Sequence, residues 1–344
     1  MSWQRIRGHE QIIQSFDHVV RRGRLAHAYL FTGPPGVGKR LFAGELAKAL
    51  LCEGQQESPR PVLEACDRCP ACLLVEAGTH PDLQTARRPD DKSEVSIDIV
   101  RDLARGLDLK PARGRGKIVI LDDADDLNEE SANCFLKTLE EPPPGALLIL
   151  IGTSADRQLP TIVSRCQMVH FHPLPEALVA ELLASQGIKD AVFIRRVARL
   201  SGGSPGQALA LADPALWEFR RKLIQGLTQP RPDSVGLAQV WMKFVEEVGK
   251  ESAAQRRRAS LILRLLIDFL NDALSVSVGK SPRLADETDL PLLQRFAKQP
   301  ATDQIMQMID RCLEADLQND RNVQLVLIIE ALVDALCSVS GPVA

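Results

Sequence analysis

Two hydrophobic patterns divide the chain near residue 170. Before it, apolar runs of strand length alternate with stretches whose apolar residues recur at helical spacing. Strands separated by helices indicate a parallel sheet that is covered on both faces. Strands are predicted over 28–32, 117–121 and 146–151, and helices over 41–51 and 129–141, the second helix ending where a run of prolines follows.

Beyond residue 175 the strand signal fades and the pattern becomes helical. Short amphipathic helices are predicted over 176–186 and 191–200, and a third begins at Gln207 after a loop rich in Gly and Ser. From Pro214 onward the apolar residues keep helical spacing. We therefore expect an α/β domain over 1–170, a small helical lid over 171–212 and an all-helical domain over 213–344.

The composition is that of a protein that forms compact cores. The 344 residues are 45% hydrophobic and 25% charged, which argues against wholesale disorder. No apolar run approaches the roughly 18 residues of a membrane helix, and the first residues lack the layout of a signal peptide, so we expect a cytoplasmic protein without membrane contact. With a net charge of −3, contact with nucleic acid requires a local basic patch.

A glycine-rich segment lies between a predicted strand and a predicted helix. Gly33–Arg40 reads GPPGVGKR and matches the pattern G-x-x-x-x-G-K. Gly33, Gly36 and Gly38 let backbone N–H groups converge on a phosphate at a helix N-terminus, and Lys39 would reach the outer phosphates. The next position normally carries Ser or Thr, whose hydroxyl ligates Mg²⁺. Arg40 stands there instead, and its guanidinium offers only donors and would repel the metal.

An acidic motif follows the strand predicted over 117–121. Asp122 stands where a nucleotide triphosphatase holds Mg²⁺ with a carboxylate. Asp123 stands where such enzymes commonly carry a Glu that orients the attacking water. The shorter side chain weakens that role, because a displacement of about 1 Å can cost roughly a hundredfold in rate. The alternative interpretation is a solvated acidic loop.

Four of the eight cysteines are spaced as metal ligands. Cys52 precedes a C-x₂-C-x₂-C run formed by Cys66, Cys69 and Cys72. Four thiolates fit a closed tetrahedral Zn²⁺ site, which would be structural because no coordination position stays open. An iron–sulfur cluster and free thiols are the alternatives. The other four cysteines are expected to be small buried hydrophobic residues, namely Cys134, Cys166, Cys312 and Cys337.

Four segments, in this order, resemble the clamp-loader subunits of bacterial DNA polymerase III, which belong to the AAA+ superfamily. They are residues 25–33, the cysteine module, residues 133–143 (NCFLKTLEEPP) and residues 159–166 (LPTIVSRC). The resemblance is strong from residue 1 to about 210. The match is closest to the δ′ type, and the γ/τ type is its nearest relative.

This resemblance implies an AAA+ nucleotide domain, a helical lid and a helical collar that joins subunits into a ring. It implies γ/τ and δ subunits as partners in a hetero-pentamer that opens the sliding clamp (β) and places it on primed DNA. It also implies that Arg165, in the Ser-Arg-Cys motif, acts as an arginine finger on a neighbour's ATP. Thr153 matches a sensor of the γ-phosphate, and Gly206 falls where a second sensor, an Arg, is expected.

Three departures from the family pattern weaken hydrolysis, whereas Arg165 is kept. They are Arg40, Asp123 and Gly206. We therefore expect a catalytically silent, δ′-like stator, an accessory subunit of a DNA-directed DNA polymerase holoenzyme without ATPase activity of its own. The alternatives are an active γ/τ-like ATPase and a scaffold that holds ADP without turnover. Whether ATP or ADP binds in its own site stays open.

Three basic clusters are the candidates for DNA contact. A solvated surface is the expected role of each, and phosphate contact by the second cluster is the alternative. The resemblance implies DNA contact by the assembled ring rather than sequence-specific recognition by this chain. The clusters are Arg21, Arg22 and Arg24, then Lys110, Arg113, Arg115 and Lys117, then Arg256, Arg257 and Arg258.

Overall fold

The chain divides into two compact units. A computed structural model describes residues 2–54, 62–89, 92, 94–283, 289–298 and 300–340. One unit comprises Met1–Gln186 with Gly202–Gln207, and the other comprises Gly187–Ser201 with Ala208–Ala344. The predicted lid, 171–212, contributes to both units, and the division into three domains stays a prediction. No described helix has the length and apolar character needed to span a bilayer.

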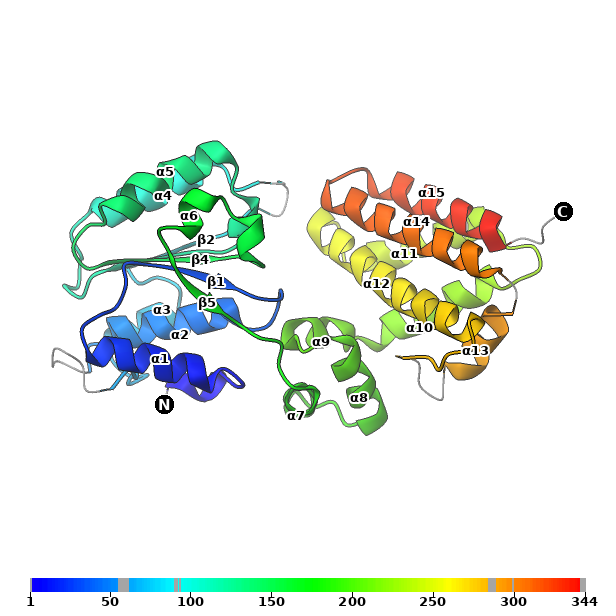
Figure 1. Cartoon of the computed structure of the whole chain (residues 1–344), viewed down its shortest axis with the longest axis horizontal. Helices are drawn as coiled ribbons and strands as arrows, with labels where there is room; N and C mark the ends of the chain where they lie inside the picture. Colours follow the sequence, from blue (N-terminus) through cyan, green and yellow to red (C-terminus); the bar gives the residue numbers. More distant parts are fainter. Residues whose placement is uncertain are drawn as a thin grey trace. The chain divides into compact units, whose positions relative to one another are not determined.

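The first unit is an α/β fold built on a five-stranded parallel sheet, with helices on both faces (Figure 1). The strand order is β2-β3-β4-β1-β5, so β4 separates β1 from β3 and pairs with both. Figure 1 shows α4 and α5 over one face and α1 and α2 over the other. The strands are β1 (Ala28–Thr32), β2 (Leu83–Ala86), β3 (Lys117–Leu121), β4 (Ala146–Ile151) and β5 (Gln167–His170).

The helices of this unit differ little from the expected ones. The helix predicted over 41–51 begins two residues earlier, and the one predicted over 129–141 ends one residue earlier. The helices are α1 (Glu10–Arg21), α2 (Lys39–Leu51), α3 (Pro70–Glu76), α4 (Ile97–Asp108), α5 (Glu129–Glu140), α6 (Pro160–Val163) and α7 (Glu176–Ser185), with 3₁₀ turns at Ser2–Arg5, Ala124–Asp126 and Ala155–Arg157.

Burial explains which strands the sequence revealed. The three predicted strands are confirmed with their predicted bounds, and nearly every residue in them is buried because helices cover both faces. β2 and β5 lie at the two edges of the sheet and were not predicted. Their residues are half-buried or exposed, so these strands carry no continuous apolar run.

Strand β1 supplies side chains to the cores on both faces of the sheet. Tyr29 and Phe31 lie on the face of α1 and α2, where the Phe31 ring centroid is 5.9 Å from that of Phe42. The alternating Ala28 and Leu30 belong to the opposite core, which includes residues of α4 and α5. Strand β1, which leads into the glycine-rich loop, therefore packs between two apolar layers.

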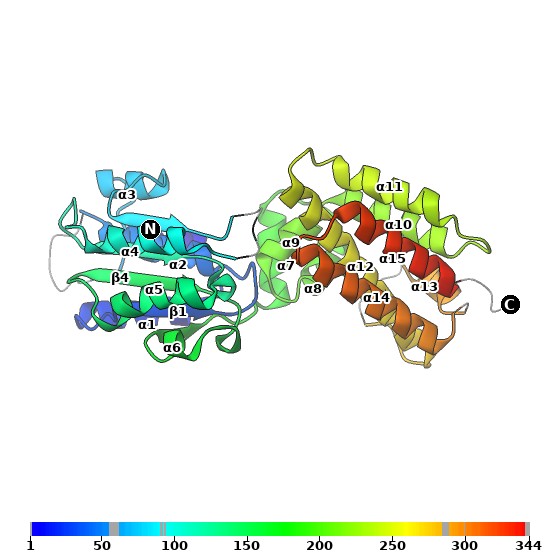
Figure 2. The same ribbon diagram turned by 90° about the horizontal axis from the view of Figure 1, so that it is seen from above.

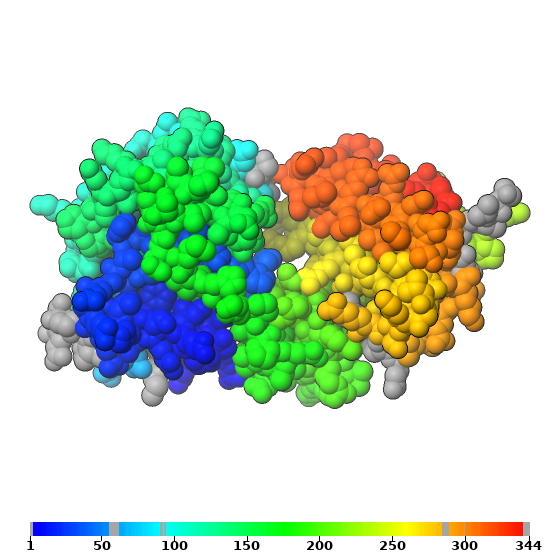
Figure 3. All heavy atoms as spheres, in the orientation of Figure 1, coloured from blue at the N-terminus to red at the C-terminus, as the bar shows by residue number. Residues whose placement is uncertain are grey.

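The second unit is helical throughout the residues described (Figure 2). Asp190, Asp213 and Asp233 each accept backbone N–H bonds at the start of a helix, which explains where α8, α10 and α11 begin. Figures 1 and 3 show α12 and α14 packed side by side. The helices are α8 (Ala191–Leu200), α10 (Pro214–Leu227), α11 (Ser234–Glu246), α12 (Ser252–Ser277), α13 (Leu290–Phe296), α14 (Thr302–Asp320) and α15 (Leu325–Ser340), while α9 (Pro205–Leu211) spans the boundary.

A buried charge cluster joins distant helices of this unit. Asp289 accepts hydrogen bonds from Arg196 of α8 and from Arg220 of α10, and all three residues are buried. The Arg196 guanidinium carbon lies 4.1 Å from the centre of the Trp217 ring. Removing the shared carboxylate would take a buried counter-charge from two buried guanidinium groups. This lowers the free energy of unfolding more than the loss of an exposed ion pair does.

We expect Asp289→Ala to lower the free energy of unfolding of this unit by about 3–5 kcal/mol. Urea denaturation followed by tryptophan fluorescence measures this, because Trp217 and Trp241 lie in the unit. Asp310→Ala, at an exposed position of α14, is the control and should change stability by less than about 0.5 kcal/mol. Equal effects of the two substitutions would contradict the assignment of the buried cluster as a stabilising element.

Candidate functional site

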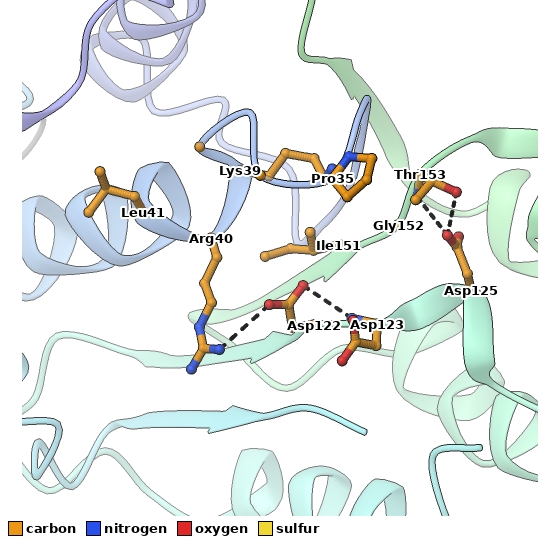
Figure 4. A pocket seen from close by; sticks show the side chains of 12 residues that line it. Pro35, Lys39, Arg40, Leu41, Asp122, Asp123, Asp125, Ile151, Gly152 and Thr153 are labelled. Atoms are coloured by element: carbon orange, nitrogen blue, oxygen red, sulfur yellow. Dashed lines mark hydrogen bonds and ion pairs between the residues drawn. The ribbon is translucent and has the colours of Figure 1, made fainter. Parts of the chain in front are cut away.

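The carboxyl ends of β1, β3 and β4 meet around a pocket of about 330 Å³ (Figure 4). Because β4 lies between the other two strands, the three strand ends share one edge of the sheet, where ligands of open parallel sheets bind. The pocket brings together seven residues predicted for the nucleotide site, Asp123 among them. The lining consists of Pro35, Gly36, Gly38, Lys39, Arg40, Leu41, Asp122, Asp123, Asp125, Ile151, Gly152 and Thr153.

The glycine-rich loop needs its glycines for backbone conformation and for space. Gly36 and Gly38 have φ of +75° and +111°, in the region that side chains disfavour. Gly33 does not line the pocket. Its N–H donates to the carbonyl of Thr153 at 2.9 Å, and a Cβ there would lie 2.2 Å from the carbonyl oxygen of Phe171. The loop is thus bonded to the segment after β4, and the residue after β5 leaves no room for a side chain at Gly33.

Lys39 is buried and rests on its own loop. Its Nζ donates to the carbonyl of Gly33 at 2.5 Å and to that of Pro34 at 2.8 Å. Burial lowers the pKa of Lys39, and the charges of Asp122 and Asp125 partly offset this. The ammonium group is therefore held at the loop by backbone acceptors.

Arg40 lies beside the carboxylate predicted to hold a metal ion. The distance from Nη1 of Arg40 to Oδ2 of Asp122 is 3.7 Å, while Oδ1 of Asp122 accepts from the N–H of Asp123 at 3.1 Å. Burial and the charge of Asp122 both raise the pKa of Asp123. The guanidinium of Arg40 thus supplies a positive charge beside Asp122, where a metal ion would otherwise be expected.

Asp125 lines the pocket but is not one of the residues predicted for the nucleotide site. It accepts from the Thr153 N–H at 2.8 Å, from the Thr153 hydroxyl at 2.5 Å and from the Gln158 amide at 2.5 Å. These bonds tie the segment after β4 to the segment after β3. The hydroxyl expected to sense a γ-phosphate is engaged by Asp125 in this arrangement.

The first turn of α9 and the residue before it pack directly on the glycine-rich loop. Gly206 donates its N–H to the carbonyl of Gly36 at 2.9 Å, and the Ser204 hydroxyl donates to the carbonyl of Pro35 at 2.8 Å. A Cβ on Gly206 would lie 2.9 Å from Cα of Gly36. The position where a sensor Arg was expected therefore has no room for a side chain in this arrangement.

The four predicted cysteine ligands form a single cluster. Their sulfur atoms all lie within 4.8 Å of one another, so they could hold a metal ion. Cys52 closes α2 and Cys69 caps α3, so two helix ends position the site. The Sγ of Cys52 accepts from the N–H groups of Cys66 at 3.3 Å and Gly54 at 3.4 Å. Such donors stabilise thiolates, which are the form that binds metals.

One sulfur shows the effect of these donors most clearly. Burial raises the pKa of Cys69, but the N–H groups of Cys72 and Glu53 outweigh it and lower the pKa to about 6.

The other cysteines lie elsewhere: Cys312 and Cys337 are buried, as predicted, while Cys134 and Cys166 are half-buried.

A buried lysine links the cysteine cluster to α2, the helix that follows the glycine-rich loop. The Nζ of Lys48 lies 2.9 Å from Glu45, 3.0 Å from Asp67 and 3.3 Å from Glu76. Burial lowers the pKa of Lys48, but Glu45 and Asp67 outweigh it and raise the pKa. Asp67 stands between Cys66 and Arg68, so these ion pairs hold the cysteine loop against α2.

Arg165 lies outside the pocket, two residues after α6. Its side chain is 34% exposed. The Nε and Nη2 atoms donate to Oε1 of Glu140 at 3.0 and 2.5 Å, and Nη1 donates to the carbonyl of Thr161 at 3.0 Å. The guanidinium is therefore at the surface but held in place by partners on two sides.

Comparison with known proteins gives consistent matches. The family model described as "DNA polymerase III, delta subunit" matches residues 8–175. DNA polymerase III subunit delta′ of Pseudomonas aeruginosa is 31% identical over 335 residues, covering 93% of this chain and 94% of the relative. Its Escherichia coli counterpart is 32% identical over 265 residues, covering 77% and 73%.

Two further matches are more partial or more distant. DNA polymerase III subunit tau of Escherichia coli is 34% identical over 219 residues, covering 61% of this chain and 32% of tau. Among solved structures, a DNA polymerase III gamma subunit-related protein from Thermotoga maritima is similar, with a TM-score of 0.45, 14% identity, and coverage of 95% of this chain and 99% of that one.

The cysteine cluster is testable with Co²⁺, which reports thiolate ligation by visible absorption. We expect metal-free protein to develop the absorption of a tetrahedral thiolate complex on titration, and Cys69→Ser to lose it. Cys134→Ser, outside the cluster, is the control and should keep the spectrum. Because the ligands must be deprotonated, the absorption should fall on acidification. An unchanged spectrum in Cys69→Ser would exclude the predicted ligand set.

Proposed function

The chain belongs to the family of DNA polymerase III delta′ subunits, and from this premise we propose that it is a catalytically silent stator of the clamp loader. In this role it assembles with γ/τ and δ subunits in a hetero-pentamer that loads the β sliding clamp on primed DNA in the cytoplasm. The observation that carries the proposal is the charge arrangement of the pocket. Arg40 faces Asp122, whereas Arg165 lies outside the pocket at the surface.

The proposed silence follows from the missing metal position. Mg²⁺ in such a site needs a hydroxyl from the residue after Lys39 and a carboxylate from Asp122. Arg40 replaces the hydroxyl, and its charge next to Asp122 opposes a second cation there. Losing one preorganised charge contact costs about 3–4 kcal/mol of transition-state stabilisation. The packing of Gly206 on Gly36 leaves no place for a compensating Arg.

A second candidate function is an active, γ/τ-like ATPase. The pocket itself and the retained Lys39 favour it, because the glycine-rich loop can still cradle phosphates. Holding ADP without turnover needs the same two features. The charge of Arg40 separates the active ATPase from the scaffold that holds ADP, since hydrolysis requires the metal ion that Arg40 opposes.

We expect ADP to bind with the same affinity in the presence and absence of Mg²⁺. The reason is that Arg40 occupies the place of the metal ligand. In Arg40→Thr, which restores a hydroxyl, Mg²⁺ should strengthen binding by about tenfold or more. Isothermal titration calorimetry measures both, and Arg24→Thr, at an exposed position, is the matched control. Tighter binding with Mg²⁺ in the unchanged chain would contradict the proposed role of Arg40.

The proposed arginine finger acts on the neighbouring subunit. Arg165 lies outside its own pocket and keeps part of its surface exposed, so its charge is available to another chain. A guanidinium at a transferring phosphoryl group stabilises the charge that develops there. This supports a division of labour in which the chain lends a cation and contributes no hydrolysis.

Reconstitution of the complex with γ/τ, the proposed ATPase subunits, and δ tests whether this chain assists hydrolysis without performing it. We expect Arg165→Ala to lower DNA-stimulated ATP hydrolysis several-fold, because the ATP site of one γ/τ subunit loses the guanidinium that stabilises its transition state. Lys39→Ala should leave the rate nearly unchanged, because its own pocket does not turn over. Steady-state phosphate release is the measurement. Loss of activity in Lys39→Ala with normal activity in Arg165→Ala would favour the motor alternative.

We also propose that the cysteine cluster holds a structural Zn²⁺. The donor set supports this, since four sulfurs within 4.8 Å of one another give a closed tetrahedral site without a position for substrate. The ligands would be Cys52, Cys66, Cys69 and Cys72, and the ion would fix the loop between α2 and α3. An iron–sulfur cluster remains the alternative that metal analysis of the purified protein decides.

A further inference from the structure

We infer that Glu140 is a positioning residue that orients Arg165 toward the neighbouring active site. This inference rests on the proposed function of Arg165 as a finger. Glu140 is the last residue of α5, and Arg165 follows α6, so the two side chains come from separate elements. One oxygen of Glu140, Oε1, accepts from both Nε and Nη2 of Arg165 at 3.0 and 2.5 Å.

Stability does not account for the carboxylate at this place. The last turn of a helix carries partial negative charge, so an acidic residue there is unfavourable. The pair is also open to water, with 34% of the Arg165 side chain and 53% of the Glu140 side chain exposed. Ion pairs of this kind contribute little to folding. A residue that breaks a local preference without a gain in stability points to a functional role.

The hydrogen bonds show what that role would be. Glu140 holds the edge of the guanidinium formed by Nε and Nη2. Among the residues that the structure describes, the remaining nitrogen, Nη1, donates to neutral acceptors alone, the carbonyl of Thr161 at 3.0 Å and the hydroxyl of Ser164 at 3.2 Å. A phosphate displaces neutral acceptors more readily than a carboxylate, because charge-assisted bonds are stronger.

Holding one edge fixes the plane of the group. Arg has a long side chain with large rotamer entropy, and a finger must order that side chain at the phosphate. With Glu140 in place, the guanidinium is already oriented, and only Nη1 and the second N–H of Nη2 have to find new partners. Glu140 thus reduces the ordering that the transition state would otherwise require.

The test uses the reconstituted complex with γ/τ, δ, clamp and primed DNA. We expect Glu140→Ala to lower kcat for ATP about threefold to tenfold with KM and complex assembly unchanged. Glu140→Gln should recover part of the loss, since an amide oxygen accepts the same bonds without the charge. Glu141→Ala is the matched control, because it removes the same charge one residue away at an exposed position.

A double-variant cycle separates orientation from a general effect on structure. If Glu140 acts through Arg165, Glu140→Ala adds no further loss in the Arg165→Ala background. An additive loss, an equal effect of Glu141→Ala, or a raised kcat in Glu140→Ala would overturn the inference. If Arg165→Ala lowers the rate and Glu140→Ala does not, this inference alone fails. If Arg165→Ala has no effect, the finger role itself fails.

Discussion

Parallel pairing of β1, β4 and β3 is the constraint on which the functional geometry depends. It brings three strand ends to one edge of the sheet, so that Lys39, Asp122 and Thr153 line the same pocket although they are far apart in sequence. Two apolar layers hold β1 in register from both faces. Because the strands are rigid, the chemistry at this edge is decided by a few side chains in the turns that follow them.

Those side chains satisfy one another within the chain. Arg40 faces Asp122, Lys39 rests on carbonyls of its own loop, and Asp125 engages Thr153. Each contact uses a group that an ATPase of this fold needs for metal or phosphate. The same unit carries Arg165 at its surface, oriented by Glu140 rather than by the pocket. The proposed stator therefore rests on two separate cations, Arg40 beside Asp122 in its own pocket and Arg165 at the surface, where it is offered to a neighbouring site.

Local pattern predicted the parts of this fold that are buried on both faces or fixed by short motifs. β1, β3 and β4 carry continuous apolar runs, and the cysteine spacing and the glycine-rich loop each identify a site within a short stretch. The sequence does not predict the edge strands β2 and β5, because half-exposed strands lack continuous apolar runs. Contacts between distant segments, such as Gly206 on Gly36 or Glu140 on Arg165, leave no local pattern, because the tertiary fold alone brings them together.

A single-turnover experiment tests most directly whether the pocket can break a phosphoanhydride bond. The isolated chain, in excess over ATP labelled at the γ-phosphate and with Mg²⁺ present, would be followed for phosphate release. We expect phosphate release no faster than with Lys39→Ala protein or without protein. Release that depends on Mg²⁺ and disappears in Lys39→Ala would contradict it.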